Sequence, residues 1–397
     1  MYDEDVFIAG GGPAGLAAAI AARLAGFSVM LVDCGQPPID KACGEGIMPE
    51  GVAALAQLGV SFPAGQAFAF HGIKFIECGG SDGHDATCMV EARFPHAEPG
   101  SLSSPMAGFD SATGLGIRRT VLHQRLLERA CRLGVKMLWQ ARGVEITPEG
   151  ASVYGELVRS CWLVCADGQN SRLREQAGLC PARRQGSSAG SLRRFGFRRH
   201  YRMTPWSDFV EVYWSDCGQL YVTPVAGNQI SIALLTRHPG LRLEDALPRF
   251  APVSHRLRGA MPSTRELGGL TVTRRLPLVQ RGNAALIGDA SGSVDAITGE
   301  GLSMAFQQAL ELAQAMTSGD LNIYQRAHRR ILRRPYVMAE LMLAMDRHHG
   351  LRRRVFRAFE ADPSLFRRLV SIHIGVRPPR SLGIDGVLSF AWRLFAA

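Results

Sequence analysis

The residues that most constrain the fold lie at the start of the chain, where a short apolar run leads into a glycine-rich turn. Residues 6–9 read Val-Phe-Ile-Ala, and the next six residues are Gly-Gly-Gly-Pro-Ala-Gly. An alanine-rich stretch with helical character follows from 16 to 25. A strand, a tight glycine turn and a helix in this order begin a dinucleotide-binding βαβ unit. The sequence therefore predicts an α/β protein with a Rossmann-type domain.

Three glycines of this turn have the spacing GxGxxG, and each has a different task. Gly10 permits the tight turn, Gly12 lets the backbone approach a pyrophosphate, and Gly15 lets the helix pack closely. The phosphate is expected at the helix N-terminus, beside Pro13 and Ala14.

A second apolar run, residues 28–32, ends in Asp33. This acid follows Gly10 at the distance of about 20 residues where a carboxylate accepts hydrogen bonds from ribose hydroxyls. The βαβ unit is thus complete, although it does not by itself distinguish NAD from FAD.

Two further loops carry nucleotide-binding character. Residues 162–165 form an apolar run that closes on Asp167 and Gly168, and residues 284–287 form another that closes on Gly-Asp before a glycine-rich helix start. Such helix starts offer backbone amides to phosphate. The candidate cofactor-binding residues of the later loop are Gly288, Asp289, Gly299, Gly301 and Leu302. Loops so far apart in sequence imply one extended ligand, and FAD is long enough to contact them all.

The series GxGxxG, ADGQNS at 166–171 and GDASG at 288–292 resembles the p-hydroxybenzoate hydroxylase superfamily of flavoproteins. The KACGEG segment at 41–46 and the TGEGL segment at 298–302 look like motifs of its geranylgeranyl reductase branch. The resemblance implies FAD as the cofactor and NADPH or NADH as the electron donor. It also implies that Lys41, Cys43 and Gly44 pass close to the flavin, and that Arg119 contacts FAD.

The chain departs from the superfamily at two places. A proline usually follows the GD pair, but residues 293–296 read Ser-Val-Asp-Ala. The tyrosine, tryptophan and proline box of the reductase branch keeps only Tyr221 and Pro224. The WxWxIP box of flavin halogenases is absent from the sequence.

Few side chains need to be catalytic, because the flavin carries the redox chemistry. Cys43 is expected to face the ring, with a small buried side chain as the alternative. Glu45 and Glu300 are the acids expected near the active site, with helix capping as the alternative for each. Asp295 stands where the proline is expected and is a further proton-transfer candidate.

We expect a discontinuous FAD-binding domain over residues 1–75, 117–183 and 274–318. Residues 76–116 and 184–273 are expected to form a substrate-binding sheet domain, because alternating runs such as 209–214, 219–225 and 229–235 are typical of antiparallel strands. Residues 193–200 begin this sheet with many arginines, which indicates either a solvated edge strand or recognition of a phosphate or carboxylate.

Residues 319–397 are expected to form a C-terminal helical region. Its methionine-rich stripe predicts either core packing or the lining of an apolar tunnel. The stripe consists of Met338, Leu341, Met342 and Met345.

The composition excludes several classes of protein. The net charge of +10 comes almost entirely from dispersed arginines without a recognition motif, so nucleic-acid binding is not expected. Nine cysteines without a CxxC pair predict no metal site and a reducing cytoplasm. A peripheral membrane contact of the basic region 326–380 and the apolar segment 387–395 stays open, and we expect a monomer or homodimer.

Two reactions on a hydrophobic small molecule compete. A monooxygenase would hydroxylate or epoxidise an aromatic, polyketide or isoprenoid substrate, and we rank it first. A reductase would saturate carbon–carbon double bonds of an isoprenoid lipid. A halogenase and a non-catalytic binding protein rank below both.

Overall fold

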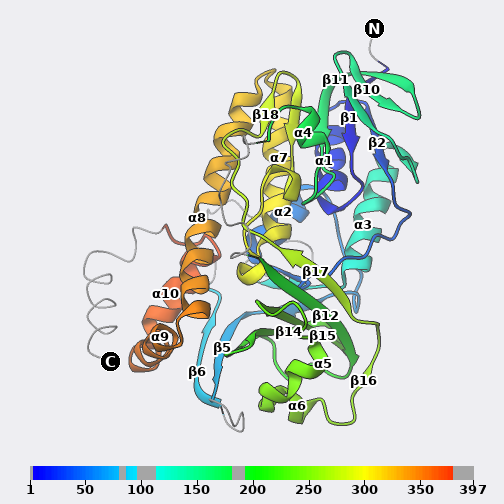
Figure 1. Ribbon diagram of the computed structural model, residues 1–397. Coiled ribbons are helices and arrows are strands. Elements are labelled where there is room, and N and C mark those ends of the chain that lie inside the picture. The colour runs from blue at the N-terminus through cyan, green and yellow to red at the C-terminus, as the bar shows by residue number, and fades with distance from the viewer. Residues whose placement is uncertain (1–2, 80–85, 96–112, 181–192, 379–397) are drawn as a thin grey trace.

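The computed structural model describes residues 3–79, 86–95, 113–180 and 193–378. A mainly parallel sheet and a mainly antiparallel sheet lie one above the other in Figure 1, and the last helices run along one side of both. The predicted fold class is therefore confirmed.

The first sheet has eight strands, with the path β18-β19-β11-β1-β2-β8 and with β10 and β9 continuing from β11. Neighbours among β8, β2, β1, β11 and β19 run parallel, and β18 is antiparallel. The strands are β1 (Glu4–Ala9), β2 (Val29–Asp33), β8 (Lys136–Trp139), β9 (Glu145–Thr147), β10 (Gly150–Val153), β11 (Glu156–Cys165), β18 (Gln280–Arg281) and β19 (Ala284–Leu286).

The turn between β1 and α1 (Pro13–Leu24) fixes the first motif. Gly10 has a φ of +118°, and a Cβ there would lie 2.2 Å from the carbonyl oxygen of Ala166 on the neighbouring motif. A Cβ on Gly15 would lie 1.8 Å from the carbonyl oxygen of Gly10. Both positions therefore require glycine, because any side chain would push the helix or the neighbouring loop away.

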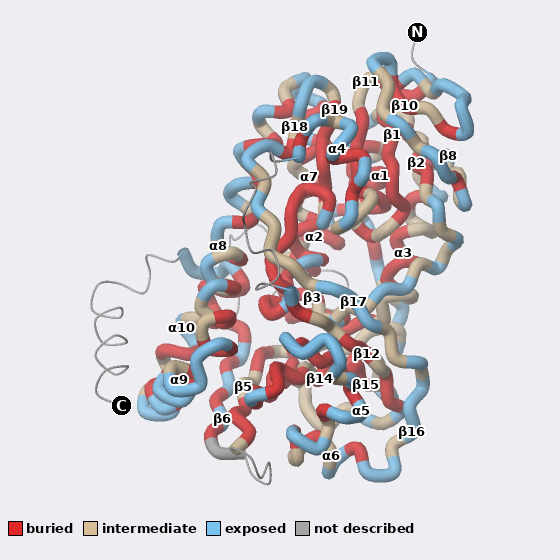
Figure 2. Tube along the Cα trace, viewed as in Figure 1, coloured by how far each residue is buried: buried red, intermediate tan, exposed pale blue. Residues whose placement is uncertain are grey.

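Helices α3 (Arg119–Arg132) and α7 (Gly301–Thr317) pack against α1, and α2 (Pro49–Gln57) packs against α7. The alanines of α1 are buried against them, so the small side chains let the helices approach closely. Figure 2 shows α1, α7 and the strands beside them mostly in the colour of buried residues.

The second sheet also has eight strands, with the path β16-β12-β15-β14-β13-β5-β6 and with β17 paired to β12. The β5–β13 pair is parallel and the others are antiparallel. The strands are β5 (Gly72–Cys78), β6 (Ala86–Arg93), β12 (Arg194–Arg202), β13 (Val210–Ser215), β14 (Gly218–Ala226), β15 (Gln229–Thr236), β16 (Met261–Pro262) and β17 (Leu267–Thr271).

A small antiparallel sheet of β3 (Gly46–Ile47), β7 (Gly114–Gly116) and β4 (Phe68–Phe70) lies beside the second sheet through contacts of β14 with β4 and β7. Short helices follow the motifs and strands. They are α4 (Leu173–Gln176), α5 (Leu243–Ala246) and α6 (Ala251–Arg256), with 3-10 turns η1 (Leu247–Arg249), η2 (Gly288–Ser291) and η3 (Ala296–Thr298).

Three helices end the described chain: α8 (Leu321–Arg347), α9 (His349–Ala361) and α10 (Pro363–His373). Asp320 and Asp362 cap α8 and α10, since their carboxylates accept from the amides of Asn322 and Ser364. Helices α9 and α10 contact β6. None of the helices within the described ranges has the length and apolarity that crossing a membrane would require.

The predicted domain boundaries stay a prediction, but the sheets show how the segments are distributed. The first sheet takes its strands from residues 4–33, 136–165 and 280–286, and the second from 72–93 and 194–271. Strand β5 belongs to the second sheet, although the expected boundary at residue 75 falls inside it. The apolar segment 387–395 lies outside the described residues.

Candidate active site

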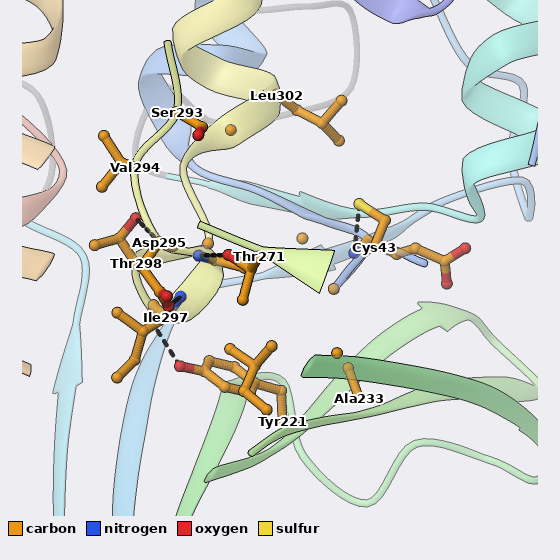
Figure 3. Close-up of a pocket in the computed structure, with 18 of the residues that line it drawn as sticks. Cys43, Tyr221, Ala233, Thr271, Ser293, Val294, Asp295, Ile297, Thr298 and Leu302 are labelled. Atoms are coloured by element: carbon orange, nitrogen blue, oxygen red, sulfur yellow. Dashed lines mark hydrogen bonds between the residues drawn. The ribbon is translucent and has the colours of Figure 1, made fainter. Parts of the chain in front are cut away.

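A cavity of about 350 Å³ lies where the glycine-rich turns face the second sheet and the C-terminal helices. Figure 3 shows the loop from Ser293 to Thr298 on one side of it, Cys43 on another, and Tyr221 and Ala233 on the second sheet below. The sequence-predicted residues that line the cavity are Gly12, Pro13, Ala14, Lys41, Cys43, Gly44, Glu45, Arg119, Gly168, Gly288, Asp289, Asp295, Gly299, Gly301 and Leu302.

The remaining sequence-predicted residues lie behind this lining. Gly10 and Gly15 form the close contacts described above. The carboxylate of Asp33 accepts hydrogen bonds from the amides of Gly11 and Gly35, each at 2.6 Å. Glu300 is buried beside Arg334.

Asp167 also lies outside the lining. Its carboxylate accepts from the amides of Arg172 at 2.9 Å and Leu173 at 3.2 Å, where it fixes the start of α4. The role of Asp167 toward FAD stays a prediction. The cofactor-binding and catalytic roles of the other predicted residues also stay predictions.

The open backbone of the cavity fits FAD. A Cβ added to Gly12, Gly44 or Gly301 would meet no atom within 4 Å, so the chain at these points faces free space. Gly12 and Gly301 mark the N-termini of α1 and α7, and neither helix has a side-chain cap. Amides at uncapped helix starts bind phosphate and other anions. The arrangement accommodates a dinucleotide that runs from one helix start to the other.

Unpaired polar atoms support the same fit. Within the described ranges, Arg119 Nε and Asp167 Oδ1 are buried without a hydrogen-bond partner. Buried polar groups in a folded protein normally have partners, so unpaired ones mark a place for a ligand or water. Arg119 would hold the anionic part of FAD, and Asp167 an amide or hydroxyl.

Lys41, Asp289 and Gly168 bring three sequence motifs together. A Cβ on Gly168 would lie 3.3 Å from Lys41 Nζ. The positive charge of Lys41 also interacts electrostatically with the carboxylate of Asp289. The surrounding protein raises the pKa of Asp289 by desolvation, and Lys41 and Arg119 oppose that rise. The carboxylate is accessible from the cavity, where it would accept hydroxyls of FAD.

Glu45 is held by a network that reaches from the cofactor loop to the second sheet. It has a φ of 62° and is 1% exposed. Its Oε1 accepts from the amide of Arg119 at 2.8 Å, and its Oε2 lies 2.5 Å from Nε2 of His200 on β12. Burial raises the pKa of Glu45, but the hydrogen bond from His200 and the charge of Arg198 outweigh it, so the pKa is lowered.

The network fixes the tautomer of His200. Arg198 Nη1 lies 3.1 Å from Nδ1 of this ring, and an arginine can only donate. Nδ1 is therefore an acceptor, and Nε2 carries the proton that it donates to Glu45. Arg198 also pairs with Asp40 at 2.5 Å, so strand β12 and the cofactor loop share one polar cluster.

Cys43 lies in the cavity wall next to this cluster. Its Sγ accepts from the amide of Glu45 at 3.4 Å. Desolvation raises the pKa of the thiol, and the nearby Arg119 lowers it by less. Cys43 is therefore a neutral thiol at pH 7.

Asp295 lies in a second buried cluster. Its carboxylate pairs with Arg194 at 2.7 Å and accepts from the amide of Ile297 at 3.0 Å, which caps η3. Arg194 also donates to Gln219, whose amide donates to Asp346 of α8 at 2.6 Å. This cluster joins the loop in the cavity wall to the second sheet and α8.

The arginines of residues 193–200 differ from the solvated edge strand that the sequence favoured. β12 is paired on both sides, and Arg194 and Arg198 are 3% and 1% exposed. They neutralise Asp295 and Asp40 instead of facing water. Sequence reasoning missed His200 as well, and the only signal for it was the density of basic residues in this segment.

The far part of the cavity is an apolar arm between the second sheet and the C-terminal helices. It includes the whole methionine-rich stripe of α8, and Met342 and Met345 of this stripe also pack in a buried apolar cluster. The side chains of the arm are Ile73, Phe75, Val210, Val212, Met338, Leu341, Met342, Met345, Phe359, Phe366, Leu369 and Val370.

Residues 3–195 match the model of a family described as FAD binding domain. These residues form an FAD-binding domain, and the chain is an FAD-dependent oxidoreductase. The flavoprotein is 28% identical over 355 residues to a menaquinone reductase from Mycolicibacterium smegmatis, covering 84% of this chain and 81% of the relative. It is 25% identical over 353 residues to digeranylgeranylglycerophospholipid reductase 1 from Methanothermobacter thermautotrophicus, covering 81% and 80%.

A solved structure of a geranylgeranyl bacteriochlorophyll reductase-like protein from Thermoplasma acidophilum has the same fold. It aligns with a TM-score of 0.68 at 19% identity, over 99% of this flavoprotein and 96% of that chain. The family that the sequence motifs indicated is therefore confirmed.

Proposed function

We propose that this flavoprotein reduces carbon–carbon double bonds in the isoprenoid chain of an apolar lipid, with NADPH or NADH as the electron donor. The apolar arm carries the proposal. It continues directly from the candidate FAD site, and twelve apolar side chains line it. A flexible hydrocarbon chain fits such a surface because methionine and aromatic side chains adapt to irregular apolar ligands.

The relatives support the same class of substrate. Two proteins that share about four fifths of their length with this chain are named reductases of menaquinone and of a digeranylgeranyl lipid. The KACGEG and TGEG segments, which resemble the geranylgeranyl reductase branch, both contribute to the cavity wall.

FAD, when bound, takes two electrons from the nicotinamide and makes them available to the substrate as a hydride. The polypeptide positions the cofactor and the substrate and shields them from water. The open helix starts at Gly12 and Gly301 hold the cofactor, and the buried clusters around Glu45 and Asp295 fix the loops on either side of it. The apolar arm excludes water and aligns the hydrocarbon chain.

The sequence placed a monooxygenase first. The reductase ranks first here because the last three helices add apolar side chains to the cavity wall and because the relatives carry reductase names. Monooxygenation of a hydrophobic substrate stays the alternative prediction.

An anaerobic assay separates the two reactions. The purified holoenzyme is incubated without oxygen with NADPH or dithionite, and with either a menaquinone bearing a polyprenyl tail or a digeranylgeranylglycerol phospholipid. Mass spectrometry is expected to detect the gain of two hydrogens per reduced double bond. Product that forms only with oxygen, and contains an oxygen atom from it, would instead establish the monooxygenase.

The peripheral membrane contact also stays a prediction. Helices α9 and α10 contribute Phe359 and Phe366 to the apolar arm and carry exposed arginines on the other side, among them Arg353, Arg354 and Arg367. Figure 2 shows the outer side of α9 as exposed. Such a face is suited to anionic lipid headgroups.

A further inference from the structure

A cluster of titratable groups lies behind the cavity wall at the start of α7. Glu300 precedes the helix and is 3% exposed. Arg334 reaches it from α8, Glu50 lies at the start of α2, and His373 lies in the last turn of α10. Four helices thus meet at one buried carboxyl group.

The cluster has one permanent cation for two carboxyl groups. Arg334 binds both oxygens of Glu50, at 2.8 and 2.5 Å, but approaches Glu300 only once, at 3.3 Å. Glu50 therefore receives most of the charge of Arg334. Burial raises the pKa of Glu300 to about 8, which Arg334 opposes and Glu50 reinforces. At neutral pH the deeper carboxyl group keeps its proton.

His373 lies between this carboxyl group and the cavity. It lines the cavity, and its Nδ1 is 3.4 Å from Oε2 of Glu300. Burial lowers the pKa of His373 to about 4, Arg334 lowers it further, and a backbone hydrogen bond with Thr298 opposes both. The imidazole is therefore neutral at pH 7, and the contact with Glu300 is not an ion pair.

The protonation states of the two groups are complementary. Because the backbone carbonyl of Thr298 accepts one N–H of the ring, the other nitrogen is free to accept. An ionised Glu300 would place two acceptors opposite each other, whereas a protonated one points a donor at the imidazole. In the described part of the chain, Glu300 Oε2 and His373 Nδ1 are both buried without a hydrogen-bond partner, and they lie 3.4 Å apart.

We propose that Glu300 and His373 store and deliver the proton that the reduction of a double bond consumes. His373 is the catalytic residue at the cavity wall, and Glu300 is a positioning residue that acts through it. This inference rests on the proposed function.

The step balances in atoms and electrons. A hydride forms a C–H bond at one carbon; NADPH would supply it as a hydride through the cofactor, whereas dithionite would supply two electrons and solvent the proton. The π electrons of the double bond form a C–H bond at the other carbon with the ring proton of His373, whose N–H bond breaks as the proton leaves the Thr298 carbonyl. In the same step Glu300 transfers its proton to Nδ1 of the ring, so the imidazole stays neutral, and Arg334 stabilises the carboxylate that remains. Solvent beside the partly exposed Glu50 restores the proton.

Infrared spectroscopy of the FAD-bound protein tests the stored proton without an activity assay. The wild-type protein is expected to show the C=O band of a buried carboxylic acid at pH 7. Because the pKa of Glu300 is raised, the band should disappear as the pH rises through about 8. It should be missing in Glu300→Gln and present in Glu311→Gln. The control also removes a carboxylate that joins α7 to α8, since Glu311 pairs with Arg330 at the surface.

Rapid mixing tests delivery. Enzyme reduced under anaerobic conditions is mixed with the polyprenyl menaquinone, and formation of the saturated product is followed. Ferricyanide, which takes electrons without a proton, replaces the lipid in a parallel reaction. Glu300→Gln and His373→Gln are expected to slow product formation at least tenfold and to remove its pH dependence near 8. Oxidation by ferricyanide should stay unchanged, and Glu311→Gln should behave as wild type.

The outcomes separate the two proposals. A wild-type enzyme that saturates no double bond overturns the proposed function and this inference together. A wild-type enzyme that does so, while both variants keep its rate and pH profile, overturns the inference alone. An ionised Glu300 in the wild-type spectrum at pH 7 also overturns it, and this measurement needs no variant to fold.

Discussion

His200 Nε2 lies 2.5 Å from Oε2 of Glu45, so a strand of the second sheet holds the loop that carries Cys43 along the cavity. The two residues are 155 positions apart in sequence and are both buried. A hydrogen bond from an imidazole N–H to a buried carboxylate is worth more than one between neutral groups. The substrate side of the molecule therefore helps to set the shape of the cofactor side.

Replacing His200 should destabilise the fold and change its pH dependence. In His200→Leu the buried carboxylate of Glu45 loses its donor, and we expect a loss of about 2 kcal/mol in the free energy of unfolding. Because the folded pKa of Glu45 is lowered, its contribution is complete above the ordinary glutamate pKa of about 4.3 and is lost as the pH falls through the folded value. Urea unfolding between pH 7 and pH 3 measures both effects.

The control is His71→Leu, which removes an exposed contact with Asp208 at 3.4 Å. It should cost less than about 1 kcal/mol. Equal losses in the two variants would contradict the importance of the Glu45 network.

The two glycines of the first turn should respond differently to the same substitution. Gly12→Val places its side chain in open cavity, so the apoprotein should fold normally but lose FAD. Gly15→Val forces a Cβ within 1.8 Å of the Gly10 carbonyl oxygen, so the fold itself should suffer. Flavin absorbance per protein and thermal unfolding of the apoproteins distinguish the two. Normal flavin content in Gly12→Val would remove the turn from the cofactor site.

Asp295 should matter for stability through its ion pair. In Asp295→Asn the buried Arg194 loses its closest carboxylate and keeps only the longer contact with Asp346 at 3.8 Å, so we expect a loss of about 3 kcal/mol. Glu244→Gln is the matched control, because it breaks an exposed pair with Arg199 on the same strand. Denaturant unfolding gives the stability, and turnover per bound flavin tests the proton-transfer role that the sequence predicted. Unchanged stability with lost turnover would favour that catalytic role.

A bulky side chain in the apolar arm should block the substrate without displacing the cofactor. Leu341→Trp fills space between α8 and the second sheet, so we expect normal flavin content and at least a tenfold lower kcat/KM for a polyprenyl substrate. Val337→Trp on the exposed side of the same helix, where the residue is 64% accessible, should have little effect. Similar losses in both variants would show that α8 tolerates no tryptophan, and would argue against a specific block.

Local chemistry explains how much of the site could be predicted from sequence. The motifs around Gly12, Gly168 and Asp289 line one cavity, as expected for loops that would each hold the cofactor through a few consecutive backbone atoms. Each of these motifs lies within a short segment of the sequence, so it can be recognised without knowing the rest of the structure. The strands of the second sheet were predictable for the same reason, since their alternation is local.

The buried clusters could not be predicted in this way. The partner of Glu45 is on β12, and the partner of Asp295 is Arg194 on the same strand. Nothing near either acid in sequence identifies its partner, and an arginine-rich strand normally indicates solvent. Only the packing of two sheets shows that these charges neutralise each other inside the protein.

The division of the cavity wall has an evolutionary consequence. Much of the apolar arm comes from α8, α9 and α10, whereas the cofactor-facing turns come from earlier segments. Substitutions in the last helices can therefore retune the length and bulk of the accepted hydrocarbon while flavin retention stays under separate selection. Descendants of one ancestral flavoprotein could diverge in lipid preference by remodelling this terminal wall alone.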